Sequence, residues 1–206
     1  MNPHTHDATH DHGPAAKDHD DKLTYYGAME IGLRELLIAK GVFTAEDVRV
    51  AVEAMDSRTP ENGARLAARA WTDGAFKARL LSDASAAARE MGYEIGPLKL
   101  MAVESTPKLH NLIVCTLCSC YPRMLMGLPP AWYKSAAYRS RAVLAEFGTH
   151  VPDDVEVRVH DSTADLRHMV LPVRPAGTNG WTEEQLVPLI TRDSLIGVAV
   201  PSLPAR

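Results

Sequence analysis

The sequence lacks the features that are typical of a membrane-spanning protein, a nucleic-acid-binding protein or a secreted protein. No apolar run approaches the roughly 20 residues that a membrane-spanning helix needs, and the N-terminus has neither the basic leader nor the apolar core of a secretory signal. No basic stripe with interleaved aromatic residues is present, so we expect no nucleic-acid partner. The cytoplasm is therefore the expected compartment.

Cysteine is scarce: the chain has three, and all of them lie in one short segment. An odd and local set does not form the disulfide framework that is typical of a small secreted domain. Otherwise the composition is that of an ordinary globular protein, with 206 residues, 46% hydrophobic content and 23% charged residues. The chain is therefore long enough for one sizeable domain with a hydrophobic core.

The chain is expected to have three parts. Residues 1–22 are rich in histidine and aspartate and are expected to be a disordered tail, which either gathers metal ions weakly or stays solvated. Residues 23–92 are predicted to form an N-terminal helical arm, because Met29, Leu33 and Leu36 lie at helix spacing. Residues 93–206 are predicted to form a domain that contains both helices and strands.

Helices interrupt the strands of residues 93–206 without alternating with them regularly, which favours an α+β fold. The predicted strands are Leu98–Glu104, Leu109–Val114, Val155–Val159, Met169–Val173 and Leu195–Val200. Helices are predicted over 131–147 and, from a capping box that begins at Thr182, over 182–191. His160 and His168 are expected to lie at the surface.

The three cysteines lie in the segment VCTLCSCYP, residues 114–122, directly after a predicted strand. Cys115 and Cys118 have the spacing of a zinc knuckle, to which Cys120 or His110 would add ligands, although no second ligand pair exists elsewhere. The same two cysteines would suit a redox site, but Cys120 would then have no role. A disulfide within the segment would close a small, strained ring.

An unusual metal centre is a further interpretation of this segment. Cys118-Ser119-Cys120 places two thiolates on either side of two peptide nitrogens, so that loss of both amide protons would give a near-planar S–N–N–S claw. Cys115 would bind from the axial direction. Only a strongly Lewis-acidic ion, such as trivalent cobalt or iron, would hold ionised amides, and five protein ligands would leave one position open for water or substrate. Spacing alone leaves zinc, a redox pair and this centre open.

The same segment resembles the metal-binding motif of the nitrile hydratase α subunit family, which includes the related thiocyanate hydrolase γ subunit. Further segments resemble blocks of that family, and the likeness extends over about residues 28–200. These blocks are AWTD with FK at 70–77, GLPP with WY at 127–133, YRSR at 138–141, LPVRPAGT at 171–178 and TRDSLIGV at 191–198.

The resemblance implies a set of ligands and a fold. Cys115, Cys118 and Cys120 would be the sulfur ligands, and the backbone nitrogens of Ser119 and Cys120 would complete the claw. Cys118 is expected as the sulfinic acid and Cys120 as the sulfenic acid. Thr116, where iron-dependent members carry serine, indicates a non-corrin Co(III) centre, with Fe(III) as the alternative. The implied fold of residues 93–206 is an αββα sandwich-like metal-binding catalytic domain, preceded by a helical arm that wraps around a partner subunit.

The activity that the resemblance implies is hydration of a nitrile to the amide, with Cys120 and Ser119 as the catalytic residues. A β-type partner subunit would supply arginines to the oxidised cysteines. A cobalt-delivery activator protein would load the metal. Thr116 and Arg123 are predicted to line the substrate pocket.

One departure from the family pattern favours a second function. Arg123 follows Tyr121-Pro122 where typical nitrile hydratases have tryptophan, and thiocyanate hydrolases resemble this chain in carrying arginine there. The arginine favours a thiocyanate hydrolase γ subunit, which converts thiocyanate to carbonyl sulfide and ammonia, unless the side chain merely faces solvent or a partner. A zinc-stabilised interaction module without catalytic activity is the third hypothesis.

Overall fold

The computed structural model describes residues 23–116, 120–135, 137–138 and 144–204. The tail predicted over 1–22 therefore lies outside the described residues. The chain divides into two compact units, Met1–Ala51 and Val52–Arg206. In the described part of the chain, no helix is long and apolar enough to cross a membrane.

The first unit contains α1 (Tyr25–Ala39) and the start of α2 (Ala45–Asp56), which confirms the helices predicted there. The Thr24 side chain caps α1 by accepting a hydrogen bond from a first-turn N–H at 3.0 Å. At α2, the Thr44 N–H donates to Asp47 Oδ2 at 2.8 Å, and the Asp47 N–H donates back to Thr44 Oγ1 at 3.1 Å. Neither helix has a buried residue, so their apolar side chains take no part in a hydrophobic core.

Three helices begin the folded part of the second unit: α3 (Pro60–Thr72), α4 (Gly74–Ser82) and α5 (Ala84–Glu90). An aspartate caps each of the last two. Asp73 accepts two first-turn N–H groups of α4 at 2.9 and 3.0 Å, and Asp83 accepts one from α5 at 2.9 Å. The buried faces of α3 and α5 consist mainly of alanine, whose short side chain lets the neighbouring elements approach closely.

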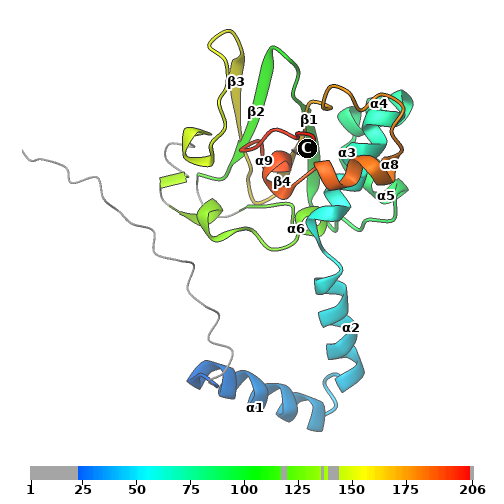
Figure 1. The fold of residues 1–206 in the computed structure, drawn as a ribbon. Coiled ribbons are helices and arrows are strands. Elements are labelled where there is room, and N and C mark those ends of the chain that lie inside the picture. Colours follow the sequence, from blue (N-terminus) through cyan, green and yellow to red (C-terminus); the bar gives the residue numbers. More distant parts are fainter. Residues whose placement is uncertain (1–22, 117–119, 136, 139–143, 205–206) are drawn as a thin grey trace, which may run out of the picture. The chain divides into compact units, whose positions relative to one another are not determined.

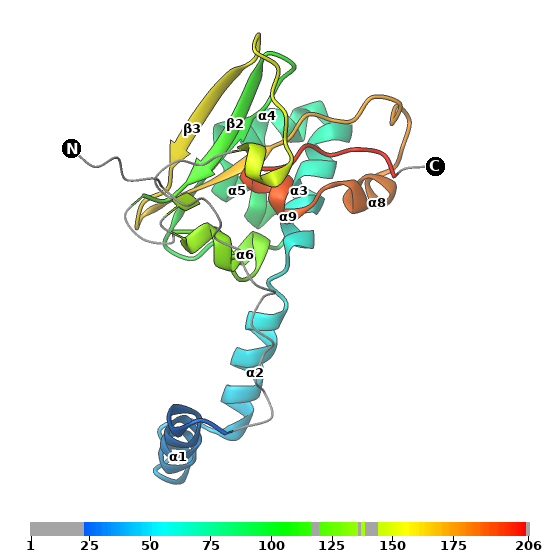
Figure 2. The ribbon, with the colours of Figure 1, turned by 60° about the vertical axis from the view of Figure 1, so that its left-hand side comes forward.

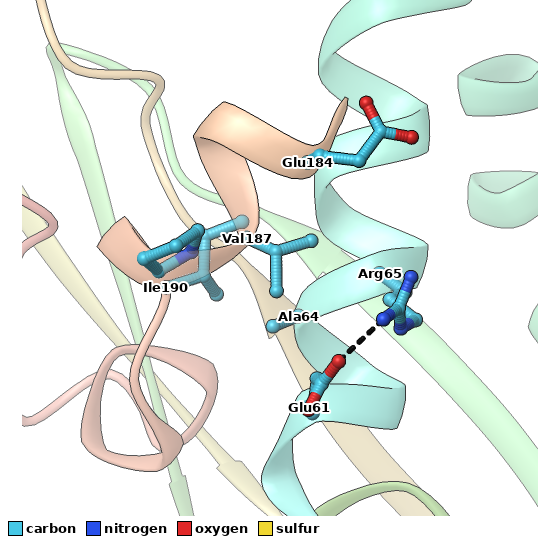
Figure 3. A pocket seen from close by; sticks show the side chains of 7 residues that line it. Glu61, Ala64, Arg65, Glu184, Val187 and Ile190 are labelled. Carbon is cyan, nitrogen blue, oxygen red and sulfur yellow. Dashed lines mark hydrogen bonds and ion pairs between the residues drawn. The ribbon is translucent and has the colours of Figure 1, made fainter. Parts of the chain in front are cut away.

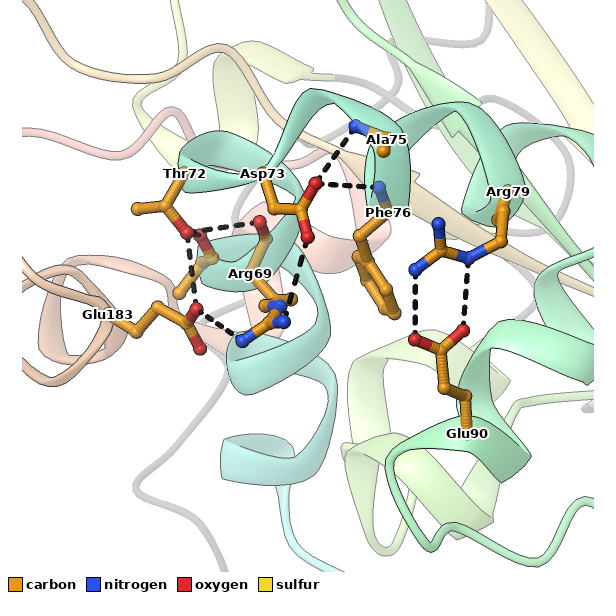
Figure 4. A network of polar contacts seen from close by, with 9 residues as sticks. Arg69, Thr72, Asp73, Ala75, Phe76, Arg79, Glu90 and Glu183 are labelled. Atoms are coloured by element: carbon orange, nitrogen blue, oxygen red, sulfur yellow. Dashed lines mark hydrogen bonds and ion pairs between the residues drawn. The ribbon is translucent and has the colours of Figure 1, made fainter.

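A surface network joins these helices to one another and to the C-terminal part of the chain (Figure 4). Arg69 Nη1 and Thr72 Oγ1 both donate to Glu183 Oε1 at 3.2 Å. Arg79 donates two hydrogen bonds to the Glu90 carboxylate, at 2.9 and 3.0 Å, and so joins α4 to α5. Exposed pairs of this kind each contribute little to the free energy of unfolding. The network therefore shows mainly that α3 lies beside the start of α8, and α4 beside α5.

Among the residues that the structure describes, four strands form two parallel pairs (Figures 1 and 2). β1 (Lys99–Glu104) pairs with β4 (Leu166–Leu171), and β2 (Leu109–Val114) pairs with β3 (Glu156–Asp161). β2 also packs against β4, α4 and α5 pack on β1, and α9 (Arg192–Ile196) packs on β4 and β2. The layers therefore run from the β3–β2 pair through the β4–β1 pair to α4 and α5. Strand side chains at the centre of the core include Leu100, Leu112, Ile113, Met169 and Leu171.

These four strands confirm four of the predicted strands to within a few residues, but the fifth, at Leu195–Val200, is wrong. The chain forms α9 over Arg192–Ile196 instead. Thr191 Oγ1 accepts a first-turn N–H of that helix at 3.2 Å. Gly197 ends it at φ 96°, where a side chain would overlap the carbonyl oxygen of Asn111 in β2. The apolar run is therefore divided between a helix and its glycine cap.

The helix predicted over 131–147 is confirmed only in part in the described residues: residues 137–138 are α-helical, but Ser135 interrupts the helix. The chain forms a short 3₁₀ helix, η1 (Ala131–Lys134), and then takes an extended conformation at Ser135, with φ −66° and ψ 146°. A second 3₁₀ helix, η2, covers Leu144–Phe147. Ser135 Oγ accepts the Tyr138 N–H at 3.1 Å, so a new turn begins after the break. This break places Tyr138 in the hydrophobic core.

Further elements in the described residues are α6 (Arg123–Met126), α8 (Glu183–Leu186) and η3 (Val187–Leu189). The capping box predicted at Thr182 is confirmed at the start of α8. Because α3 packs against α4, α6, α8 and α9, the helices of residues 60–90 belong to the same compact unit as the strands. The mixture of helices and strands agrees with the predicted α+β class, whereas the division into tail, arm and catalytic domain stays a prediction.

Candidate metal centre

The cysteine segment begins where β2 ends. Cys115 directly follows Val114, which is paired with Asp161 at the end of β3. Because the two strands are parallel, their carboxyl ends meet at one edge. There Asp161 accepts the Thr116 N–H at 3.0 Å and the Thr116 hydroxyl at 2.5 Å, and the Ser162 N–H donates to the Val114 carbonyl at 2.8 Å. The residue after the first cysteine is thus attached to β3.

The two cysteines that the structure describes are buried. Cys115 is 1% exposed and Cys120 is 7% exposed. The other predicted ligands, Cys118 and Ser119, lie outside the described residues. In the parts of the chain that are described, no group of three or more His, Cys, Asp or Glu side chains is arranged to hold a metal ion. The predicted ligand set therefore stays a prediction.

His110, a candidate zinc ligand by its position in the sequence, makes a hydrogen bond to the residue that ends α9. Its Nε2 lies 2.7 Å from the carbonyl oxygen of Gly197. Since a carbonyl can only accept, this ring nitrogen carries the proton and is not available to bind a metal. The contact supports a structural role, in which His110 joins β2 to the end of α9.

His160 and His168 lie against each other, with ring centroids 5.4 Å apart. His160 Nε2 is 2.8 Å from Asn111 Oδ1, and His168 Nδ1 is 3.4 Å from Ser162 Oγ. Burial lowers the pKa of both imidazoles; Arg158 lowers that of His160 further, and His160 lowers that of His168 further. The surface position predicted for His168 is wrong, because it lies on β4, which packs against β2, and it is buried.

A cluster of tyrosines packs against the cysteine segment. The Tyr133 ring lies 5.1 Å from that of Tyr121 and 5.5 Å from that of Tyr138. The Tyr133 hydroxyl donates to the carbonyl of Cys120 at 3.0 Å, and the Tyr138 hydroxyl donates to the carbonyl of Ile113 at 2.6 Å. Burial raises the pKa of all three tyrosines well above the ordinary value, so their hydroxyls remain protonated donors. Sequence reasoning missed these contacts, since only the WY and YRSR blocks marked the region.

The two residues predicted to line the substrate pocket lie on either side of residues 117–119, and both are exposed. Arg123 begins α6, and its N–H donates to the Tyr121 carbonyl at 2.8 Å. Its guanidinium makes no hydrogen bond or ion pair with the residues that the structure describes. The Thr116 hydroxyl, by contrast, is bound by Asp161. Arg123 is thus the more available of the two for a ligand.

A groove of about 410 Å³ lies between α3 and the α8–η3 segment (Figure 3). It is lined by Glu61, Ala64, Arg65, Glu184, Val187, Pro188 and Ile190. Arg65 donates to Glu61 Oε1 at 2.5 Å along one wall. None of the predicted site residues lines this groove, so it carries no part of the metal-centre hypothesis.

Comparison with known proteins identifies the family. Residues 24–199 match the family described as "Nitrile hydratase, alpha chain". The chain belongs to the nitrile hydratase α-chain family. Its nitrile hydratase members are subunits of hydro-lyase enzymes that act as a complex, and the resemblance seen in the cysteine segment and the other blocks is confirmed.

Among the relatives in this family, the α subunit of the low-molecular-weight cobalt-containing nitrile hydratase of Rhodococcus rhodochrous is 48% identical over 184 residues. The match covers 84% of this chain and 88% of that subunit. The γ subunit of the thiocyanate hydrolase of Thiobacillus thioparus is 42% identical over 199 residues, with 88% and 82% covered. Both similarities extend far beyond the cysteine segment.

Solved structures agree with this assignment. A recombinant thiocyanate hydrolase with partially modified cobalt centres matches with a TM-score of 0.78 at 39% identity, covering 90% of this chain and 96% of that chain. An Fe-type nitrile hydratase of Comamonas testosteroni Ni1, a double mutant, matches with a TM-score of 0.77 at 42% identity, covering 88% and 94%. The mixed helix and strand fold is therefore that of the nitrile hydratase α chains.

The described residues of this nitrile hydratase family member fit a metal centre of the predicted kind. Cys115 and Cys120 are both buried, and the Tyr133 hydroxyl donates to the Cys120 carbonyl. Thiolates favour transition metals over magnesium or calcium, and a buried thiolate needs a cation nearby to remain charged. Cobalt agrees with the cobalt-containing relatives, and the Fe-type structure is consistent with iron as the alternative.

Proposed function

We propose that this chain is the metal-bearing α subunit of a cobalt-type nitrile hydratase, which adds water to a nitrile to form the amide. The observation that carries the proposal is the segment at 114–122, which leaves the end of β2 with Cys115 and Cys120 buried. The 48% identity to a cobalt-containing nitrile hydratase α subunit supports it. The αββα sandwich arrangement of the catalytic domain is part of the same proposal.

The proposed ligands are the sulfur atoms of Cys115, Cys118 and Cys120 and the backbone nitrogens of Ser119 and Cys120. Ionised amides require a trivalent ion, so Co(III) is proposed, with Fe(III) as the alternative. Cys118 is the sulfinic acid and Cys120 the sulfenic acid in this proposal. When bound, the metal supplies the Lewis acidity that polarises the nitrile.

Cys120 has a second role in the proposed reaction. Its sulfenate oxygen either attacks the nitrile carbon or activates the water that does so. If water attacks, its oxygen becomes the amide oxygen. If the sulfenate oxygen attacks, that oxygen becomes the amide oxygen, its bond to sulfur breaks, and the oxygen of the water re-forms the sulfenate. In both cases the two hydrogens of the water end on the nitrogen. Ser119 contributes its backbone nitrogen rather than its hydroxyl.

A β-type partner subunit is proposed to complete the site. Oxygenated sulfurs carry negative charge, and arginines of the partner would stabilise them by charge-assisted hydrogen bonds. The exposed apolar stripe of α1 supports such a partner, since its side chains recur at helical spacing and none is buried. The stripe consists of Tyr26, Met29, Leu33 and Leu36. An activator protein is proposed to deliver the cobalt.

Thiocyanate hydrolysis is the second candidate function, and Arg123 is the observation that favours it. A guanidinium without a partner among the described residues is available to bind an anion such as thiocyanate. The identity to the thiocyanate hydrolase γ subunit, at 42%, is lower than the 48% to the nitrile hydratase α subunit, so nitrile hydration is preferred. The third candidate, a zinc-stabilised interaction module, predicts stoichiometric zinc and unmodified cysteines.

Product assays on the complex of this chain with its partner subunit separate the candidates. The complex is incubated with a panel of nitriles, and amide is measured; it is also incubated with thiocyanate, and carbonyl sulfide is measured. The proposal expects amide as the main product. Carbonyl sulfide as the main product would replace it with the second candidate. A complex that contains zinc and forms neither product would support the third.

A further inference from the structure

Two buried tyrosine hydroxyls contact the two ends of the cysteine segment. Tyr133 is fully buried and donates to the carbonyl of Cys120 at 3.0 Å. Tyr138 is 4% exposed and donates to the carbonyl of Ile113 at 2.6 Å. Ile113 lies two residues before Cys115, and Cys120 is the last of the three cysteines. The two hydroxyls therefore hold the backbone on both sides of the segment.

The two tyrosines come from one short stretch, and the rings around them fix their positions. Their own rings lie 5.5 Å apart, and Trp132 contacts both, at 6.0 Å from Tyr133 and 4.8 Å from Tyr138. Phe147, the last residue of η2, lies 4.6 Å from Trp132. Rings packed in this way have little freedom to move, so the hydroxyls are fixed relative to each other. The spacing of the two carbonyls is thereby set by the hydrophobic core.

Such a fixed spacing matters for a claw of two thiolates and two ionised amides, which tolerates only small errors in ligand position. Each contact that orders the backbone before the metal arrives lowers the cost of ordering it at binding. Both hydroxyls bind carbonyl oxygens, which are not among the proposed ligands. They therefore act on where the ligands lie and leave every ligand atom available.

We propose that Tyr133 and Tyr138 are positioning residues, which hold Cys115 and Cys120 at the spacing that the metal requires. This inference rests on the proposed function. The test uses Tyr133→Phe and Tyr138→Phe, because phenylalanine keeps the ring packing and removes only the hydroxyl. The matched control is Tyr93→Phe, since Tyr93 is partly buried against the core and its hydroxyl has no hydrogen-bond partner among the described residues.

The first measurement does not depend on the metal. Amide hydrogen exchange is followed in the complex as purified, for the peptide 112–121 and for the β1 peptide 99–104. Tyr133→Phe and Tyr138→Phe are expected to raise exchange in 112–121 by about tenfold, because each loses one hydrogen bond, and to leave 99–104 unchanged, while Tyr93→Phe changes neither. Unchanged exchange in 112–121 would overturn the proposal. Equal acceleration in 99–104 would overturn it as well, because it indicates a general loss of stability.

The second measurement is cobalt release. The cobalt-loaded complex is mixed with excess chelator, and release is followed through the visible absorption of the sulfur–cobalt bonds. Both tyrosine variants are expected to release cobalt about 10- to 100-fold faster than the wild type and Tyr93→Phe. Equal rates would overturn the positioning role. A wild-type complex without cobalt would contradict the proposed function. The exchange measurement would still decide whether the two tyrosines hold the segment.

Discussion

Asp161 accepts two hydrogen bonds from Thr116, one from the backbone N–H at 3.0 Å and one from the hydroxyl at 2.5 Å. The pair joins the end of β3 to the residue that follows Cys115. Hydrogen bonds to a carboxylate are stronger than those to a neutral acceptor, so the contact is firm although both residues are exposed. The Asp161 contact joins the start of the cysteine segment to β3, and the hydroxyls of Tyr133 and Tyr138 join the backbone on both sides of the segment to the hydrophobic core.

Replacing Asp161 by alanine removes both acceptors. Cobalt retention and amide formation by the complex are expected to fall by about 10- to 100-fold, because groups that orient metal ligands typically have effects of this size. The unfolding temperature should change little, since the pair is exposed. The control is Asp165→Ala, whose carboxylate is exposed and has no partner among the described residues. Equal cobalt content and activity in the two variants would contradict this role of Asp161.

Gly197→Ala is expected to destabilise the protein strongly. The glycine has φ 96°, and an added Cβ would overlap the carbonyl oxygen of Asn111. Both effects oppose the native backbone, so the free energy of unfolding should fall by about 3 kcal/mol or more. Gly74→Ala is the control: it begins α4, with nothing within 4 Å of the added Cβ, and should be neutral or slightly stabilising. Denaturant unfolding measures both, and similar losses would argue against a close approach of α9 to β2.

The stability of the protein should depend on pH through His160 and His168. Burial lowers the pKa of both in the folded state, so the unfolded chain takes up protons first as the pH falls through the ordinary imidazole range, about 6.5. The stability that depends on the two neutral imidazoles is therefore fully present above this range and is lost as the pH falls below it. The unfolding temperature should therefore fall as the pH is lowered from about 7.5 to about 5.5.

His168→Gln should make this fall smaller, because it removes the more buried of the two imidazoles. His150→Gln, at an exposed position, serves as the control and should keep the wild-type dependence. A pH profile for His168→Gln that coincides with that of the control would contradict the assignment of the effect to the buried pair.

Binding of the partner subunit should depend on α1. Leu33 and Leu36 are 58% and 51% exposed, and neither contributes to a core. Changing both to aspartate should weaken the complex at least about tenfold, because large apolar side chains would be lost from the interface. The unfolding temperature of the isolated chain should not change. The control is Ala39→Asp, which adds a charge without removing a large side chain. Titration with the partner subunit should give this variant the wild-type affinity. Equal loss of affinity in the two variants would exclude the stripe as the contact.

Much of the strand pattern could be predicted from the sequence, because it depends on local signals. The strand Leu109–Val114 is predicted with its observed bounds, and Val155–Val159 is close to β3. The strand predicted at Leu195–Val200 is wrong because the start of the apolar run lies between two helix-capping residues. Threonine at 191 and glycine at 197 are a start and a stop signal for a helix, and the structure uses both.

The contacts that support the cysteine segment could not be predicted in the same way. Thr116 meets Asp161 across 45 positions of the sequence, and Ile113 meets Tyr138 across 25. Both contacts depend on strand register and on the break at Ser135, neither of which leaves a local pattern. The cysteines were found because their spacing is itself the signal, whereas the residues that hold them were not.

The measurement that tests the central claim most directly is metal analysis of the co-expressed complex, together with the mass of the peptide that contains Cys118 and Cys120. The account predicts stoichiometric cobalt and three added oxygen atoms, two on the sulfinic acid and one on the sulfenic acid. Stoichiometric zinc on a peptide without added oxygen would contradict it.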